Sequence, residues 1–381
     1  MYEPDYNTER KNAGFSWSAN ATYYTLLDIS GISLKEFNIN PDAGIELFKK
    51  EHREAIREIY GEGVGIPGIS TPSISYGHVN GLGIELIFPD DGEVNYVRDS
   101  KSIDEWIEIL KLKKGIDFSK EGMAPFYLDY KSKLEKAYPG ESVGFSYGYE
   151  GPITTAYEIR DSNVFYDPYD EPEKFKEFLE HLTDSIIDFV KFYSRENAQP
   201  AFSRISAGMC DDIAALFSPS MWEEFILPYW NKYYSGLTSG KRCVHCEDLT
   251  EGHMYLMEKV ALSKYDPGIS HKLSPEIICK NTRVPFEWRM GSFHIKDLEV
   301  NEIEDWVYKA VADGTSCVFT TIVDDMLDDD TVEKVKIFIK SSKNAEKMLK
   351  EGISREKIGD MVSYEGREKF WNLWPRHYYS N

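Results

Sequence analysis

The chain has 381 residues, of which 41% are hydrophobic, and its formal net charge is -21. This length suits one large decorated domain, and the hydrophobic content is sufficient to form its core. Such an acidic surface repels phosphate backbones and anionic lipids, so we expect neither nucleic acid nor a membrane as a partner.

The first residues, MYEPDYNTERK, lack the basic and apolar segments of a signal peptide, and no apolar run reaches the ~18 residues of a membrane span. We therefore expect a cytoplasmic protein. The cysteines are sparse and odd in number, which argues against a disulfide framework and leaves reduced thiols or metal ligands. They are Cys210, Cys243, Cys246, Cys279 and Cys317.

Residues 1–142 form an irregular N-terminal half that includes an extension and an insertion. Residues 41–60 are predicted to form a helix, and residues 61–83 are rich in Gly, Pro and Ser and are predicted to be a loop. The segments 84–88 and 94–97 can pair as a hairpin around the PDDG turn. An insertion of this kind is typical of a decorated barrel.

Residues 143–350 alternate between strand-like and helix-like patterns. One apolar stripe predicts a helix over 174–194, and Ser218 followed by Pro219 predicts a helix start, with a kink at Pro228. Further helices are expected over 250–260, from Pro275, over 300–312 and over 330–349. Strands are expected at 201–209, 241–246, 262–265, 286–291 and 316–323.

The strands recur roughly every 25 to 40 residues, which is the period of repeated βα units. This period suits a barrel or a doubly wound sheet, and the absence of Gly-rich phosphate-binding motifs weakens a nucleotide-binding version. We expect residues 1–381 to form a single domain, with the aromatic tail 351–381 packed over its floor.

Several motifs resemble the uroporphyrinogen decarboxylase and corrinoid-dependent methyltransferase superfamily. That superfamily has an acidic residue after a strand, matched by Asp211, and then an "LLSP-x-x-F-x-x-F-x-x-P-Y" run. Here this run reads Leu216, Phe217, Ser218, Pro219, Trp222, Phe225, Pro228 and Tyr229. Weaker matches are Tyr147–Thr154, Val244–Asp248 and Met290–His294. The resemblance implies an α/β fold, a TIM (β/α)₈ barrel with an N-terminal insertion and extension.

Two activities dominate this superfamily. The cofactor-free decarboxylase grips its substrate with an arginine-rich N-terminal segment, whereas Arg10 stands alone here. The resemblance therefore favours the second activity, zinc-dependent methyl transfer involving a corrinoid. Methylation of a thiol by methylcobalamin, porphyrinogen decarboxylation and a catalytically silent barrel that binds a corrinoid protein or small ligand remain alternatives.

The metal ligands implied by the resemblance are only partly present. Cys246 matches the first cysteine of the zinc motif, and His245 is adjacent to the position of its histidine. His271 replaces the family's glutamate, and Asp324 lies near the position of the late cysteine. Zinc accepts all these ligand types. A site richer in His and carboxylate suits a methylated donor, such as a methoxylated aromatic compound, better than a thiol acceptor.

Other residues are candidates for catalysis or substrate binding. Asp211, its neighbour Asp212 and His294 follow strand ends and could move a proton, while Tyr147, Tyr149, Phe293 and His78 could contact the substrate. As an alternative to these functional roles, the aromatic residues could be ordinary packing residues, and Asp324 could belong to a solvated loop. The chain has no "D-x-H-x-x-G" corrinoid motif, so a separate corrinoid (cobalamin) protein is the expected partner. A homodimer is left open.

Overall fold

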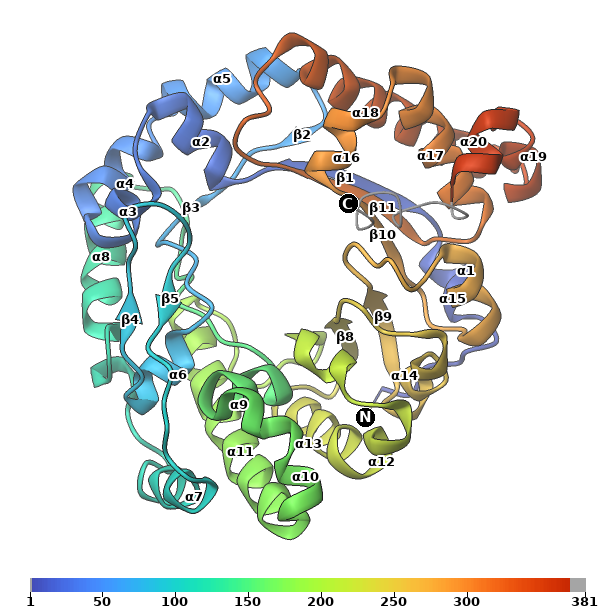
Figure 1. Cartoon of the computed structure of the whole chain (residues 1–381). Coiled ribbons are helices and arrows are strands. Elements are labelled where there is room, and N and C mark those ends of the chain that lie inside the picture. The colour runs from blue at the N-terminus through green and yellow to red at the C-terminus, as the bar shows by residue number, and fades with distance from the viewer. Residues whose placement is uncertain (1, 371–381) are drawn as a thin grey trace. The chain divides into compact units, whose positions relative to one another are not determined.

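The structure is a computed structural model that describes residues 2–370 (Figure 1). The chain divides into two compact units. The first unit comprises residues 32–47 and 68–244 together with residue 2. The second comprises residues 3–31, 48–67 and the chain from 245 onward. The division falls within strand β8 (Lys241–His245), so His245 is both the end of that strand and the first residue of the second unit.

The second unit is built on a parallel sheet in the order β10 (Glu287–Met290), β11 (Cys317–Ile322), β1 (Ser16–Ala21) and β2 (Val64–Gly65). A parallel bridge between Tyr265 and Phe286 adds β9 (Leu262–Asp266) beside β10. One face of this sheet is apolar and buried beneath α17 (Val300–Ala312) and α18 (Asp329–Lys350). The opposite face is less buried and carries Glu287, Arg289, Phe319 and Thr321, because successive residues of a strand point to opposite sides.

The first unit contains further short parallel strands. β3 (Ile69–Ser70) pairs with β6 (Val143–Gly144), and the Gly151 N–H donates to the Cys210 carbonyl at the end of β7 (Ser206–Cys210) with a distance of 2.6 Å. β7 in turn lies beside β8. The long α11 (Pro172–Glu196) packs against α7 (Ile103–Leu112), α9 (Pro152–Arg160) and α13 (Leu227–Leu237).

Most regular elements of the second half agree with the sequence predictions. α17 covers the predicted 300–312, α11 and α18 extend the predicted helices slightly, and Ser274 caps α15 (Pro275–Asn281) through its side chain. The expected kink separates α12 (Trp222–Phe225) from α13, because Pro228 in the first turn of α13 has no N–H to continue the preceding helix. The hairpin of β4 (Leu86–Ile87) and β5 (Asn95–Tyr96) is also confirmed.

Other predictions need correction. Residues 61–83 are not one loop, because they contain β2, β3 and α6 (Gly77–Leu82). Two-residue strands carry no periodic pattern, and every residue of α6 is buried, so it has no polar face to show a helical period. The single helix expected over 41–60 is two helices, α4 (Pro41–Leu47) and α5 (Lys50–Tyr60). The helix expected over 250–260 is a 3₁₀ turn at Glu251–His253 followed by α14 (Leu256–Lys259).

Several elements of the first half had no sequence prediction. They include β1, α7 and α8 (Ala124–Ala137), and the small polar residues of β1 have low strand propensity. In the C-terminal tail, α20 (Tyr364–Lys369) packs against α17, while residues 371–381 lie outside the described part of the chain. Within residues 2–370, no helix is long and apolar enough to cross a membrane. Alternating strands and helices with parallel sheets confirm the α/β class.

A buried ion pair anchors the carboxyl end of α9. The Arg160 guanidinium donates to both oxygens of Asp167 at 2.9 Å, and both side chains are nearly inaccessible to solvent. We predict that Asp167→Asn lowers the free energy of unfolding by about 3 kcal/mol, because it leaves a buried arginine without its counter-charge. Asp129→Asn, which removes the exposed pair with Lys133, is the control and should cost less than about 0.5 kcal/mol. Equal urea midpoints for the two variants would contradict the prediction.

Candidate functional site

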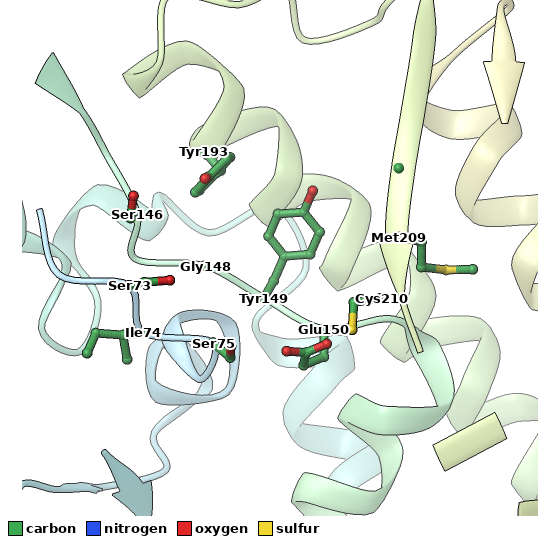
Figure 2. Close-up of a pocket in the computed structure, with 11 residues that line it drawn as sticks. Ser73, Ile74, Ser75, Ser146, Gly148, Tyr149, Glu150, Tyr193, Met209 and Cys210 are labelled. Atoms are coloured by element: carbon green, nitrogen blue, oxygen red, sulfur yellow. The ribbon is translucent and has the colours of Figure 1, made fainter. Parts of the chain in front are cut away.

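A cavity of about 510 Å³ opens in the first unit, beside the segment that follows β6 and the last residues of β7 (Figure 2). Its wall combines hydroxyl, carboxyl, thiol and aromatic groups, namely Ser75, Ser146, Tyr149, Glu150, Tyr193 and Cys210. Tyr193 comes from α11, and the other groups follow or end the parallel strands β3, β6 and β7, whose carboxyl ends are where α/β proteins place their binding sites.

Glu150 and Cys210 form the most unusual part of this wall. Burial raises the pKa of Glu150 to about 7, although the Cys210 thiol and the Ser75 hydroxyl hydrogen-bond to its carboxylate and oppose this shift. Its Oε2 atom is buried without a hydrogen-bond partner. Burial, together with the neighbouring Glu150 and Asp212 carboxylates, also raises the pKa of Cys210. The wall therefore lacks positive charge and is suited to receive a cation.

Asp211 is fully buried and bonded to protein groups. Its carboxylate accepts hydrogen bonds from the backbone N–H groups of Ile153 (3.1 Å) and Thr154 (2.6 Å) and from Trp230 Nε1 (2.6 Å). Burial raises the pKa of Asp211 to about 6, and these donors oppose the rise. Asp211 thus fixes the amino end of α9 against the end of β7. Its predicted catalytic role stays a prediction.

The residues on either side of Asp211 contribute to a group with metal-ligand spacing. Cys210 and Asp212, together with His245 at the end of the adjacent strand β8, each offer one ligand atom, and these atoms lie within 4.8 Å of one another. Within residues 2–370, no other group of three or more His, Cys, Asp or Glu side chains has this spacing. Asp266 Oδ2 lies 2.8 Å from His245 Nδ1, and Glu247 Oε1 lies 3.7 Å from His245 Nε2.

This donor set fits zinc. One thiolate, one carboxylate and one imidazole are common zinc ligands, and three protein ligands leave a position open, as in catalytic zinc sites. A carboxylate behind the ligating histidine is the usual second partner that fixes the ring's orientation. A bound cation would also favour ionisation of the Cys210 thiol, which the surrounding carboxylates otherwise oppose.

The other predicted metal ligands lie in the second unit and are not part of this group. Cys246 follows β8 directly, is buried, and donates its backbone N–H to the Asp266 carbonyl at 3.1 Å. His271, in the segment after β9, pairs with Asp248 at 3.0 Å. Asp324 follows β11 and is exposed. All three therefore come after the carboxyl ends of strands, as expected for the fold.

The predicted catalytic residue His294 lies in α16 (Ser292–Asp297), directly after β10. Its ring is buried and accepts a hydrogen bond from the Gly291 N–H at Nδ1 (3.3 Å). Burial, assisted by the positive charge of Arg289, lowers the pKa of His294 to about 3, so its imidazole is neutral near pH 7.

The four predicted substrate-binding residues lie in different environments. Tyr149 lines the cavity, and Phe293 is 38% exposed with its ring against His294. Tyr147 is buried beneath the cavity wall, and its hydroxyl donates to Asn80 Oδ1. His78 is buried in α6, with Nε2 at 3.0 Å from Ser185 Oγ, between the rings of Phe118 and Phe189. The structure thus brings only Tyr149 of these four into the wall of the cavity.

Sequence reasoning did not select Cys210, Glu150 or Asp266. A usable signal existed for Cys210, because the alternation of a strand places it on the side opposite to Asp211 and on the same side as Asp212. Asp266 directly follows the predicted strand 262–265 and precedes Pro267 and Gly268. Glu150 follows the two-residue strand β6 after several irregular residues, so no pattern marked it.

Parallel α/β units with polar groups at their strand ends place the chain among proteins of the barrel and doubly wound classes. Residues 67–273, more than half of the chain, match the family described as "Uroporphyrinogen decarboxylase (URO-D)". The protein therefore belongs to the URO-D family, as its motifs indicated.

A solved structure supports the same fold. The chain is similar to a methyltransferase from Methanosarcina mazei with a TM-score of 0.61, and the match covers 88% of this chain and 96% of that one. The two sequences are 15% identical, so the likeness concerns the fold. None of the curated proteins compared with this chain matches it.

The buried position of His78 predicts an acid-sensitive core. Burial lowers the pKa of His78 to about 3, while an unfolded histidine titrates near 6.5. The unfolded chain therefore binds the extra proton first, and stability falls as the pH drops from about 6.5 toward 3. This residue should contribute a slope of up to about 1.4 kcal/mol per pH unit below 6.

The measurement is urea unfolding at several values between pH 7 and 5. His78→Gln should flatten the loss of stability on acidification, whatever its effect at pH 7, whereas the control His181→Gln on α11 should retain the wild-type slope. A wild-type slope in His78→Gln would show that the buried ring is not responsible.

Proposed function

We propose that the protein is a zinc-dependent methyltransferase that moves a methyl group from a small methylated donor to the cobalt of a separate corrinoid protein. The proposal rests mainly on the group of Cys210, Asp212 and His245, which has metal-ligand spacing. Cys210 also lies in the wall of a cavity that can hold a small molecule. Membership of the URO-D family and the fold shared with a methyltransferase support this proposal.

The donor we propose is a methoxylated aromatic compound. Tyr149 and Tyr193 in the cavity wall offer aromatic surfaces to a flat ring, and their ring centroids lie 5.5 Å apart. An ether oxygen is a poor leaving group, because negative charge develops on it as the methyl group departs. A zinc ion held by Cys210, Asp212 and His245 would supply the Lewis acid that stabilises this charge.

The protein's own side chains prepare this chemistry by position. Asp211 holds the strand end that carries Cys210 and Asp212, and Asp266 orients the His245 ring. We propose that either His294, a neutral imidazole after β10, or Asp211 assists the reaction by proton transfer.

The proposal includes the complete architecture and the partner. We propose that residues 1–381 form one decorated (β/α)₈ barrel, as membership of the URO-D family implies. Residues 1–381 contain no "D-x-H-x-x-G" corrinoid motif, and we propose that a separate corrinoid protein carries the methyl acceptor. The remaining predicted ligands and contact residues, including Cys246, His271, Asp324 and Phe293, stay candidates for a further coordination position or for binding the donor.

Metal analysis tests whether Cys210 or Cys246 is the cysteine that binds zinc. We predict about one zinc per chain, with Cys210→Ala and His245→Ala each lowering the zinc content and the methyl-transfer activity together. Cys246→Ala tests the competing assignment from the sequence, because its buried thiol is not part of the group of three. Loss of zinc in Cys246→Ala but not in Cys210→Ala would instead support the ligand set expected from the sequence.

Methyl transfer is tested directly by following methylation of a reduced corrinoid protein with methoxylated aromatics, methanol, methylamines and methylthiols as donors. We expect the methoxylated aromatics to give the highest rate and zinc removal to lower it by at least roughly 100-fold. Faster methylation of a free thiol from methylcobalamin would contradict the proposed direction. A zinc-free protein that decarboxylates a porphyrinogen would identify the other activity of the family.

A further inference from the structure

Arg289 lies on the less buried face of the sheet in the second unit. Its neighbours Trp288 and Met290 are buried on the opposite face, so the Arg289 side chain shares its face with Glu287. The backbone register pairs Arg289 with Phe319, but its guanidinium donates from Nη2 to Thr321 Oγ1 at 2.9 Å. The side chain therefore leans toward the carboxyl end of β11, where α/β proteins bind their ligands.

The guanidinium has more donors than the protein satisfies. Arg289 Nε is buried without a hydrogen-bond partner, and the bond to Thr321 is directed to a neutral hydroxyl. A guanidinium carries five N–H donors in a planar fork that matches a carboxylate. Lys264, the other basic residue on strands β9 to β11 and β1, is already paired with Glu287 at 2.8 Å.

The nearby carboxylate of Asp266 already has hydrogen-bond partners on both oxygens. Its Oδ2 lies 2.8 Å from His245 Nδ1, and its Oδ1 accepts the Gly268 N–H at 2.9 Å. The positive charge of Arg289 contributes to the lowered pKa of Asp266, so the two groups are within electrostatic range of each other. On the other side, His294 is neutral and provides no negative charge. Among residues 2–370, the Arg289 guanidinium thus has no carboxylate partner of its own.

We propose that Arg289 binds a carboxylate group of the substrate, so that the enzyme acts on an acid rather than on a neutral compound. This inference rests on the proposed function only in naming the acid as the methyl donor, for example a methoxylated benzoate. We place the bound carboxylate at the Arg289 guanidinium and the neighbouring Thr321 hydroxyl, near the carboxyl ends of the adjacent strands β10 and β11.

A carboxylate bound at Arg289 would also position the rest of the substrate. Anchoring the acid at this strand end fixes one end of the substrate and removes rotational freedom from the bond that reacts.

The experiment measures binding of 4-methoxybenzoate and its neutral analogue 4-methoxybenzamide to the full-length, zinc-supplemented protein by calorimetry. Wild type should bind the acid more tightly than the amide by roughly 10- to 100-fold, which is the range for a charged hydrogen bond in a partly buried site. Arg289→Gln should lose this preference by weakening the acid alone. Arg289→Lys should retain part of it, because it keeps the charge but not the planar fork.

The matched control is Arg283→Gln, which removes an exposed arginine of the same unit that is paired with Glu258. It should keep the wild-type preference, and circular dichroism should show that all variants are folded. An equal affinity of wild type for acid and amide, or an unchanged preference in folded Arg289→Gln, would overturn the inference.

Methyl transfer to the corrinoid protein is measured on the same variants. Acid binding that depends on Arg289 without any methyl transfer would contradict the proposed function and leave the carboxylate site standing. Transfer from neutral donors that is unaffected by Arg289→Gln, combined with no acid preference, would retain the function and reject the carboxylate site.

Discussion

The buried carboxylate of Asp211 is the interaction on which the candidate site depends. It ties the first N–H groups of α9 and the indole of Trp230 to the end of β7, and so fixes the backbone on both sides of itself. The packing is tight enough that Gly151 has no room for a side chain, since a Cβ there would lie 2.6 Å from Asp211 Cβ. The costly burial of this acid is offset by charge-assisted hydrogen bonds rather than by a cation.

This anchoring allows two very different electrostatic environments to coexist at strand ends. In the first unit, Glu150, Cys210 and Asp212 gather acidic groups in and beside one cavity wall, and their mutual repulsion favours a cation. In the second unit, Asp266 is kept ionised by His245 and Arg289, while His294 is kept neutral. A metal ion would compensate the clustered acidic groups of the first unit, and a substrate acid would compensate the positive charge of Arg289 in the second. Both proposals therefore rest on charge as well as on geometry.

The sequence predicted what depends on long periodic patterns. α11 and α17 bury a continuous stripe of one face, so their positions are readable from residue spacing alone. β2, β3 and β6 have two residues each, and their place in the sheets is decided by pairing with distant segments. The same limit explains why His78 was assigned to a loop although it belongs to the fully buried α6.

The site was predicted more accurately by position than by residue. The sequence singled out the strand end at Asp211, and the structure places its flanking residues Cys210 and Asp212 in the ligand-type group. At the end of β8, His245 rather than Cys246 belongs to that group, and the alternation of the strand separates the two side chains. The pairing of His245 with Asp266 links residues 21 positions apart, so no local motif could reveal it.

The arrangement at Cys210, Asp211 and Asp212 also bears on how this chain can vary in length. Asp211 anchors the strand end, and Cys210 and Asp212 on either side of it are ligand-type residues. Inserting or deleting one residue would move a ligand-type residue into the anchoring position, and both functions would be lost. The hairpin between β4 and β5 has exposed residues such as Asp91 and Gly92 at its turn and carries none of the groups of the candidate site. Natural relatives and engineered versions should therefore differ freely in length at the hairpin and keep a constant length from β7 to the following helical turn.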